Sequence, residues 1–355
     1  MGYIMTPADM DAVLERLEKD YIIYAPVVYK DGGRFSDTDC VRYGKINSIE
    51  EIEFEKKSEF SFKEILTPVS QTLFFFTENE VKEADAEKKG AVVFLRNCDL
   101  HAVRRLDEMY LNNGPEDYYY KRIREKIHFV VMGCAKSFEN CFCVDMGTNK
   151  ADYETSIDAK EDGYYLDCKW EELRKYLDAA VENENAQSRQ AENRPENVTS
   201  RTAEVTPEYV TENYVHVNIP ENLSSEIGKS SLWREYDSRC INCGRCNFAC
   251  PTCTCFTMQD IFYTDNGKVG ERRRIWASCM VDGYTDVAGG GSYRQKNGER
   301  MRFKVLHKVL DFKQRNGYPM CVGCGRCDDI CPEYISFSNI INKLEDGMKE
   351  VEGDE

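Results

Sequence analysis

The sequence contains no long run of apolar residues. Although 41% of its 355 residues are hydrophobic, no stretch reaches the roughly 18 consecutive apolar residues that a helix needs to cross a bilayer. The first residues also lack the basic segment, apolar core and small-residue cleavage site of a secretory signal. We therefore expect a cytoplasmic protein with no membrane segment.

Positive charge is also in short supply. The chain has 63 Asp and Glu residues against 47 Lys and Arg residues, which gives a formal net charge of −16. Because nucleic-acid phosphates repel an anionic protein, we expect no nucleic-acid partner. The charge is compatible with a protein partner that has a basic surface.

Histidine is rare, and this excludes several kinds of catalytic site. The four histidines are His101, His128, His216 and His307. No two of them are four residues apart, so the paired histidines of zinc proteases are missing. No Ser-His or Cys-His pair is evident, and no glycine-rich dinucleotide fingerprint occurs. We expect no catalytic residue and no substrate-converting centre in this chain alone.

Cysteine, in contrast, is abundant, with 17 residues. Disulfides explain this number poorly, because the cytosol keeps thiols reduced and an odd number of cysteines cannot all pair. Metal ligation is the remaining reason for so many thiols.

Two short runs, Cys240–Pro251 and Cys321–Pro332, repeat one cysteine spacing. Each reads C-x2-C-x2-C-x3-C-P, which is typical of [4Fe-4S] ligands in bacterial ferredoxins. Gly244 and Gly325 occupy matching positions, where a missing Cβ permits positive φ and a close approach of the backbone to a cluster. The alternatives are structural zinc and a disulfide framework, but zinc sites are built from C-x2-4-C pairs and need no third cysteine at this spacing.

In two-cluster ferredoxins the fourth cysteine of each run binds the other cluster. The sequence therefore predicts two ligand sets. The first cluster is assigned to Cys240, Cys243, Cys246 and Cys331. The second cluster is assigned to Cys321, Cys324, Cys327 and Cys250. Because these eight complete two clusters, we assign no ligand role to Cys253, Cys255 or Cys279.

The first elements of the chain carry clear signals. Thr6 and Pro7 predict the N-cap and first residue of a helix. The stretch Ala25–Tyr29 predicts a strand, and the Gly- and Asp-rich residues 31–39 predict the turn of a hairpin.

The N-terminal half also predicts an α/β sheet with a cysteine-rich edge. Gly90–Leu95 and Ile127–Met132 have the pattern of buried strands, and each is followed by cysteines. Open α/β sheets place ligands beyond the carboxyl ends of their strands. If these strands are parallel neighbours, four thiols converge and could bind a third cluster: Cys98, Cys134, Cys141 and Cys143. The alternative is that these cysteines are small buried hydrophobic residues.

We predict three segments along the chain. Residues 1–180 form a mixed α/β domain, and residues 231–355 form a mainly helical, ferredoxin-like dicluster domain. Residues 181–230 are predicted to be a linker or surface insertion, because residues 182–202 contain no aromatic residue and only Val198 as a large aliphatic. A short strand is predicted at Tyr214–Asn218.

Residues 271–308 are rich in Lys and Arg although the chain as a whole is acidic. Cations at this position could balance the negative charge of nearby clusters and tune their potentials. They could equally dock a partner, and the sequence leaves both explanations open.

Several phrases of the sequence resemble the iron–sulfur electron-transfer subunit of anaerobic sulfite reductases. The phrases are Gly33–Asp39, Arg96–Ala102, Asn140–Asn149, Cys250–Cys255 and Trp276–Met280. The similarity extends over nearly the whole chain and is weakest across residues 180–230. The beta subunits of soluble [NiFe] sulfhydrogenases are similar in the same regions and are the alternative.

The resemblance implies a relay subunit in a cytoplasmic complex. In such a complex a flavin subunit oxidises NADH and a sirohaem subunit reduces sulfite to sulfide. The chain with the clusters passes single electrons between them, so the isolated chain is not expected to reduce sulfite. The alternative family implies the same relay in a [NiFe] hydrogenase.

Overall fold

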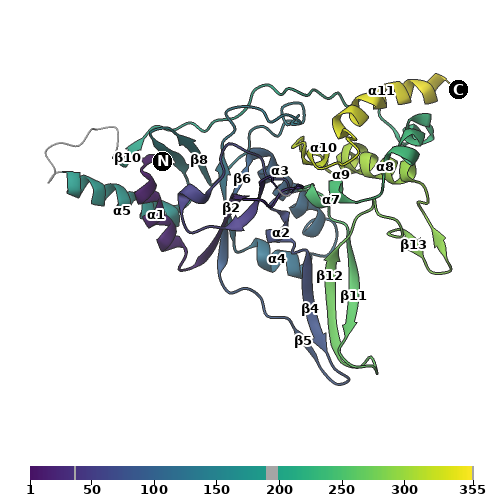
Figure 1. The fold of residues 1–355 in the computed structure, drawn as a ribbon, viewed down its shortest axis with the longest axis horizontal. Coiled ribbons are helices and arrows are strands. Elements are labelled where there is room, and N and C mark those ends of the chain that lie inside the picture. Colours follow the sequence, from purple (N-terminus) through teal and green to yellow (C-terminus); the bar gives the residue numbers. More distant parts are fainter. Residues whose placement is uncertain (36, 189–198, 354–355) are drawn as a thin grey trace.

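The computed structural model describes residues 1–35, 37–188 and 199–353. An eight-stranded mixed sheet forms the N-terminal half (Figure 1). In spatial order its strands are β10 (Arg201–Ala203), β1 (Gly2–Met5), β9 (Gly163–Cys168), β8 (Thr155–Lys160), β7 (Ile127–Met132), β6 (Gly90–Arg96), β2 (Tyr21–Tyr29) and β3 (Cys40–Lys45). Strands β2, β6, β7 and β8 are mutually parallel, and the outer strands are antiparallel.

Helices cover both faces of this sheet. Successive side chains of a strand point to opposite faces, so one strand contributes to two cores. Val92 and Phe94 of β6 pack in one core with α1 (Pro7–Leu17) and α5 (Glu171–Ser188). Val93 and Leu95 pack in a second core with α2 (Lys63–Leu66), α3 (Asn97–Tyr110) and α4 (Tyr118–Arg124). The predicted mixed α/β N-terminal region is therefore confirmed.

The helix and the hairpin predicted at the start of the chain are also confirmed. Thr6 is the N-cap of α1, and its hydroxyl accepts a hydrogen bond from the Asp9 backbone N–H at 3.2 Å. Pro7 is the first helical residue. Strands β2 and β3 pair antiparallel around the predicted turn.

A second, four-stranded antiparallel sheet projects from the body of the molecule (Figure 1). Its order is β11 (Phe256–Phe262), β12 (Gly270–Trp276), β4 (Ser70–Phe76) and β5 (Val81–Glu83). Strand β12 lies between the two cysteine runs, yet it pairs with β4 of the N-terminal half. The two halves of the chain therefore share this sheet. A small hairpin follows, formed by β13 (Asp286–Val287) and β14 (Gly291–Ser292).

Short helices surround the cysteine runs. They are η3 (Ser225–Lys229), η4 (Ser231–Arg234), α6 (Glu235–Arg239), α7 (Arg245–Ala249), α8 (Asn297–Leu306), the π-helical turn η5 (His307–Asp311), α9 (Phe312–Asn316), α10 (Arg326–Asp329) and α11 (Phe337–Gly353). A further 3-10 turn, η1 (Ile49–Glu51), packs beside α1. A third core joins α8 and α11 to Trp233 and Tyr236.

The segment predicted as a linker, residues 181–230, differs from that prediction in part. Helix α5 continues to Ser188, and Arg201–Ala203 joins the large sheet beside β1. Residues 189–198 of this segment lie outside the described residues.

The strand predicted at Tyr214–Asn218 is wrong, because side chains rather than a neighbouring strand bind its backbone. The Val217 N–H donates to Asp145 Oδ2 at 2.8 Å, and the Asn218 N–H donates to Asn342 Oδ1 at 3.0 Å.

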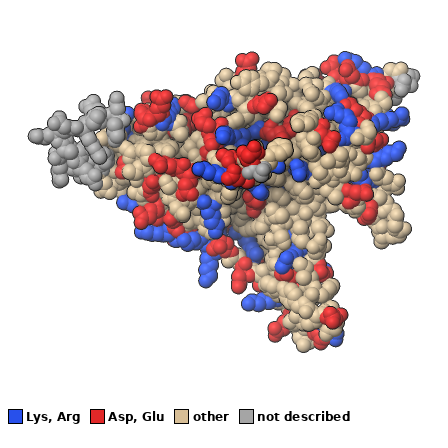
Figure 2. Space-filling view, viewed as in Figure 1, with Lys and Arg blue, Asp and Glu red and all other residues tan. Residues whose placement is uncertain are grey.

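Charged residues of both signs mix across the face shown in Figure 2, so the acidic excess does not gather into one patch there. Across the described ranges, no helix combines the length and apolar character required to span a bilayer.

Candidate metal centres

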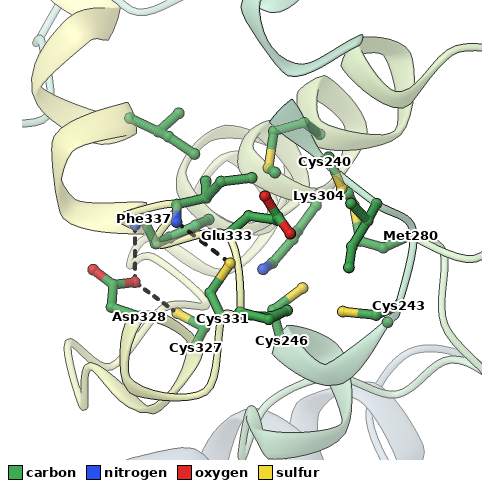
Figure 3. A pocket seen from close by; sticks show the side chains of 16 residues that line it. Cys240, Cys243, Cys246, Met280, Lys304, Cys327, Asp328, Cys331, Glu333 and Phe337 are labelled. Carbon is green, nitrogen blue, oxygen red and sulfur yellow. Dashed lines mark hydrogen bonds between the residues drawn. The ribbon is translucent and has the colours of Figure 1, made fainter. Parts of the chain in front are cut away.

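The first predicted ligand set surrounds one cavity. Cys240, Cys243 and Cys246 come from the first run, and Cys331 comes from the second run (Figure 3). Cys327, which is assigned to the second set, also lines this cavity, so the two sets are adjacent. The rest of the lining includes the apolar side chains of Met280, Met301, Ile335, Phe337 and Ile340. The pocket therefore has sulfur atoms on several sides and a largely apolar wall, with Lys304, Asp328 and Glu333 as its charged residues.

The second predicted set lies deeper. Burial raises the pKa of Cys321 to about 11 and that of Cys324 to about 12, and the charge of Cys250 contributes to both increases. Cys250 also raises the pKa of Cys327, after burial and the nearby Asp328. The fourth cysteine of the first run therefore lies among the first three of the second run.

Backbone geometry explains the glycines of both runs. Gly244 and Gly325 have φ values of 72° and 68°, which residues with side chains rarely adopt, and each precedes a short helix. A Cβ at Gly325 would lie 2.2 Å from the Asn140 carbonyl oxygen, and one at Gly244 would lie 2.7 Å from Val281 Cγ2. The backbone of Gly325 therefore packs so closely against Asn140 of the N-terminal region that no side chain would fit there.

Three buried lysines lie among these thiols. Lys63, Lys304 and Lys308 are 3%, 6% and 3% exposed. No described Asp or Glu forms an ion pair with any of them. Lys63 Nζ donates to the Cys253 carbonyl at 2.9 Å and lies over the Trp276 ring at 4.1 Å. Lys308 Nζ donates to Thr252 Oγ1 at 2.7 Å.

These lysines indicate that the site needs negative charge. Burial lowers the pKa of Lys308, but the negative charge that Cys250, Cys253 and Cys321 carry when ionised outweighs it and raises that pKa. A buried unpaired ammonium costs several kcal/mol. An anionic cluster held by four thiolates would supply the missing counter-charge, so the residues present fit such a group.

The described side chains include no group of three or more His, Cys, Asp or Glu arranged for a single metal ion. A tetrahedral zinc site would hold its sulfur ligands about 2.3 Å from one atom. The cysteines of the first set are instead spread around a cavity with apolar walls.

All four cysteines of the predicted third set line one cavity. Cys98 lies in the first turn of α3, and Cys134 follows β7. Cys141 and Cys143 lie on the next loop. The parallel pairing of β6 with β7 brings these positions together at the carboxyl ends of the strands, as the sequence predicts.

Cationic and amide groups face these thiols. Lys57 Nζ lies 3.6 Å from Cys141 Sγ, and Asn213 Nδ2 lies 3.7 Å from Cys143 Sγ. Arg96 and Arg326 also line the cavity. Burial raises the pKa values of Cys98, Cys134 and Cys143, that of Cys143 to about 12. Without a bound metal these three thiols would stay protonated at neutral pH.

The third set touches the second cysteine run directly. Cys141 Sγ lies 3.4 Å from the Cys324 carbonyl oxygen, and Lys57 Nζ donates to that oxygen at 2.8 Å. The Phe142 N–H donates to the Gly323 carbonyl at 2.8 Å. The loop that carries Cys141 and Cys143 is thus packed against the second run.

A buried ion pair also joins the second run to the N-terminal region. Arg326 of the second run donates to both carboxylate oxygens of Asp99, at 2.6 and 2.8 Å. The two side chains are 1% and 0% exposed. Arg326 also donates to the Ser58 carbonyl oxygen at 3.0 Å.

Three residues of these sites were not predicted from the sequence: Lys57, Lys63 and Asp99. Asp99 follows Cys98 directly, which is a weak signal, and Lys57 and Lys63 have no motif around them. Their roles depend on contacts with residues more than 180 positions away.

Comparisons with known proteins support the metal chemistry. Residues 239–335 match the family described as "4Fe-4S dicluster domain", which implies two [4Fe-4S] clusters. The chain is 26% identical over 347 residues to sulfhydrogenase 2 subunit beta of Pyrococcus furiosus, across 94% of this chain and 95% of that protein.

A second relative is matched over a shorter region. It is the F420-dependent formate dehydrogenase subunit beta of Methanocaldococcus jannaschii, 20% identical over 127 residues, which are 35% of this chain and 25% of that protein. No solved structure matches the chain. The chain is therefore a distant homologue of a sulfhydrogenase beta subunit, and it serves electron transfer through iron–sulfur clusters.

Proposed function

We propose that this chain is the electron relay of a multisubunit oxidoreductase of the sulfhydrogenase type. When bound, its clusters would accept and donate one electron at a time. The observation that carries the proposal is that Cys331 of the second run lines the cavity of the first set, and the effect of Cys250 on the pKa values of Cys321 and Cys324 supports the matching exchange. Two clusters held in this way are neighbours, as a relay requires.

The ligand sets are those that the spacing predicts. Cys240, Cys243, Cys246 and Cys331 hold the first cluster, and Cys321, Cys324, Cys327 and Cys250 hold the second. The buried ammonium groups of Lys304 and Lys308 balance the charge of the thiolates, and apolar side chains form much of the wall of the first cavity.

The relay extends to a third cluster, at Cys98, Cys134, Cys141 and Cys143. Three observations support this site: the four thiols share one cavity, Lys57 and two arginines face them, and Cys141 contacts the second run. The order along the relay is then third, second and first set.

The partner enzyme is a hydrogenase, because the sulfhydrogenase subunit is similar over nearly the full length of both chains. A sulfite reductase is the second candidate, since the phrases at Arg96–Ala102 and Asn140–Asn149 resemble the iron–sulfur subunit of that enzyme. Anaerobic pull-down of the tagged chain from its own cells separates the two. A nickel-containing partner supports the first candidate, and a sirohaem-containing partner supports the second.

Iron and acid-labile sulfide analysis of the anaerobically prepared chain tests the relay. Two clusters correspond to about eight irons per chain and three to about twelve. The triple variant Cys98→Ser, Cys134→Ser, Cys141→Ser should lose about four irons, whereas Cys40→Ser and Cys168→Ser, which change buried cysteines elsewhere, should lose none. About eight irons in the fully reconstituted wild type would remove the third site. An iron-free chain that is folded and active with its partners would overturn the whole proposal.

A further inference from the structure

Three cysteines near the first run are not needed by any cluster. Cys253 and Cys255 follow Pro251, and Cys279 lies just beyond β12. All three line a separate cavity of about 210 Å³ together with Arg294, Lys304 and Lys308. This cavity has thiols and cations on its walls and no Asp or Glu among its lining residues.

Strand pairing places Cys255 and Cys279 close together. The first pairing of β11 with β12 joins Phe256 to Trp276, and the Ala277 N–H donates to the Cys255 carbonyl at 3.0 Å. This pairing sets the residues before β11 beside those after β12, so Cys255 and Cys279 line the same cavity. Asn247 Nδ2 donates to Cys279 Sγ at 3.0 Å and fixes its position.

The two thiols differ in exposure and in acidity. Cys255 is partly exposed, whereas Cys279 is 4% exposed. Interaction with Cys279, together with the charge of Lys308, lowers the pKa of Cys255 to about 6. The thiolate is therefore the major form of Cys255 at neutral pH. A partly exposed thiolate in electropositive surroundings, with a second thiol nearby, is the arrangement of reactive cysteine pairs.

We propose that Cys255 and Cys279 form a thiol–disulfide exchange site that takes low-molecular-weight disulfides from the neighbouring cavity. The Cys255 thiolate attacks one sulfur of the disulfide, forms a mixed disulfide and releases one thiolate. Cys279 then gives its proton to solvent in the cavity and attacks the Cys255 sulfur, which releases the second thiolate. The sum is one protein disulfide formed and one external disulfide reduced to two thiols, so the electrons balance without a cluster.

The lining of the cavity favours an anionic ligand. Arg294, which is partly exposed, would attract the carboxylates of a small peptide disulfide, while Cys255 is the thiol exposed to it. Cys279 is buried behind it and acts as the resolving thiol.

Oxidised glutathione is the probe. The complete chain, in its complex and without oxygen, is incubated with oxidised glutathione, alkylated and digested, and its peptides are identified by mass spectrometry. The expected product is a peptide pair joined through Cys255 and Cys279, two hydrogens lighter than the free thiols. The Cys279→Ser variant should instead retain glutathione on Cys255, and Cys255→Ser should give neither product. Cys168→Ser, a buried cysteine remote from the cavity, should behave as the wild type.

The result that overturns the proposal is a wild-type chain without the cross-link, or a Cys279→Ser variant without the trapped mixed disulfide. Far-UV circular dichroism of each variant checks that it is folded. Iron analysis of the same samples keeps this test apart from that of the relay. Normal iron without the cross-link defeats only the exchange site, and the cross-link without iron defeats only the relay.

Discussion

The two cysteine runs share the phrase C-G-R-C, but their surroundings are opposite. In the first run Cys243 and Arg245 are exposed. In the second run Cys324 is 7% exposed and Arg326 is 1% exposed, because the N-terminal α/β region covers them. Burial and hydrogen bonding to the sulfurs set the reduction potential of a cluster. Equal ligand spacing therefore does not make two equal centres.

The difference in burial suits the two sites to different roles. Cys141 contacts the Cys324 carbonyl and Cys327 lines the cavity of the first set, so with the proposed ligands the second cluster would pass electrons within the chain. The first set reaches the surface at Cys243, beside the exposed side chain of Ile241. This end is placed to exchange electrons with a partner.

The largest expected effect is the loss of a cluster. Cys324→Ser and Cys243→Ser should each remove about four irons, because each takes one ligand from a different set. The remaining iron and the EPR signals distinguish the two products. Cys324 belongs to the core that also contains Val93 and Leu95 of β6, but serine is close to cysteine in size, so the N-terminal region should stay folded in Cys324→Ser, and circular dichroism checks this. Full iron content in Cys324→Ser would show that the ligand assignment is wrong.

The matched arginines should differ strongly in their effect on stability. Arg326→Leu leaves the Asp99 carboxylate buried without its partner, which should cost about 3–5 kcal/mol. Arg245→Leu changes an exposed side chain and should cost within about 0.5 kcal/mol. The midpoint of thermal unfolding of the anaerobic protein measures both. Equal midpoints for the two variants would remove the contrast between the runs.

Removal of a buried cation should shift a potential. Lys308→Met takes a positive charge from beside Cys250 and Cys321, so the second cluster should become harder to reduce. The expected shift is negative and on the order of 100 mV, from a charge interaction of about 2 kcal/mol. Redox titration followed by EPR measures it. Lys313→Met, on the helix beyond this cluster, is the control and should leave the potential unchanged.

The smallest expected effect concerns the exposed end. Ile241→Ser and Tyr334→Ser alter side chains that are 56% and 88% exposed. Each should change the free energy of unfolding by within about 0.5 kcal/mol. If either variant lowers it by several kcal/mol, the first site is not the open end of the molecule.

Local rules predicted much of the fold. The Thr6–Pro7 signal marks the start of α1, and the apolar runs at Gly90–Leu95 and Ile127–Met132 mark β6 and β7, because each depends on residues close together in the chain. The strand predicted at Tyr214–Asn218 failed because Asp145 and Asn342, distant in sequence, bind its backbone. No local pattern reports such partners.

The candidate site likewise has features that local sequence predicted and features that it did not. The cysteine spacing alone predicted two cluster motifs, since most ligands of one cluster must be only a few residues apart to fit around it. The spacing did not predict that Lys57, Lys63 and Asp99 would lie among the thiols.

The sequence by itself determined the chemistry of this protein: which thiols occur in ligand runs and which strands end in cysteine. Only the tertiary structure decided that one run is buried beneath the α/β region while the other stays open, and that β12 joins β4. The physical reason is that burial and charge pairing arise between segments far apart in the chain, and the sequence does not specify those distances locally.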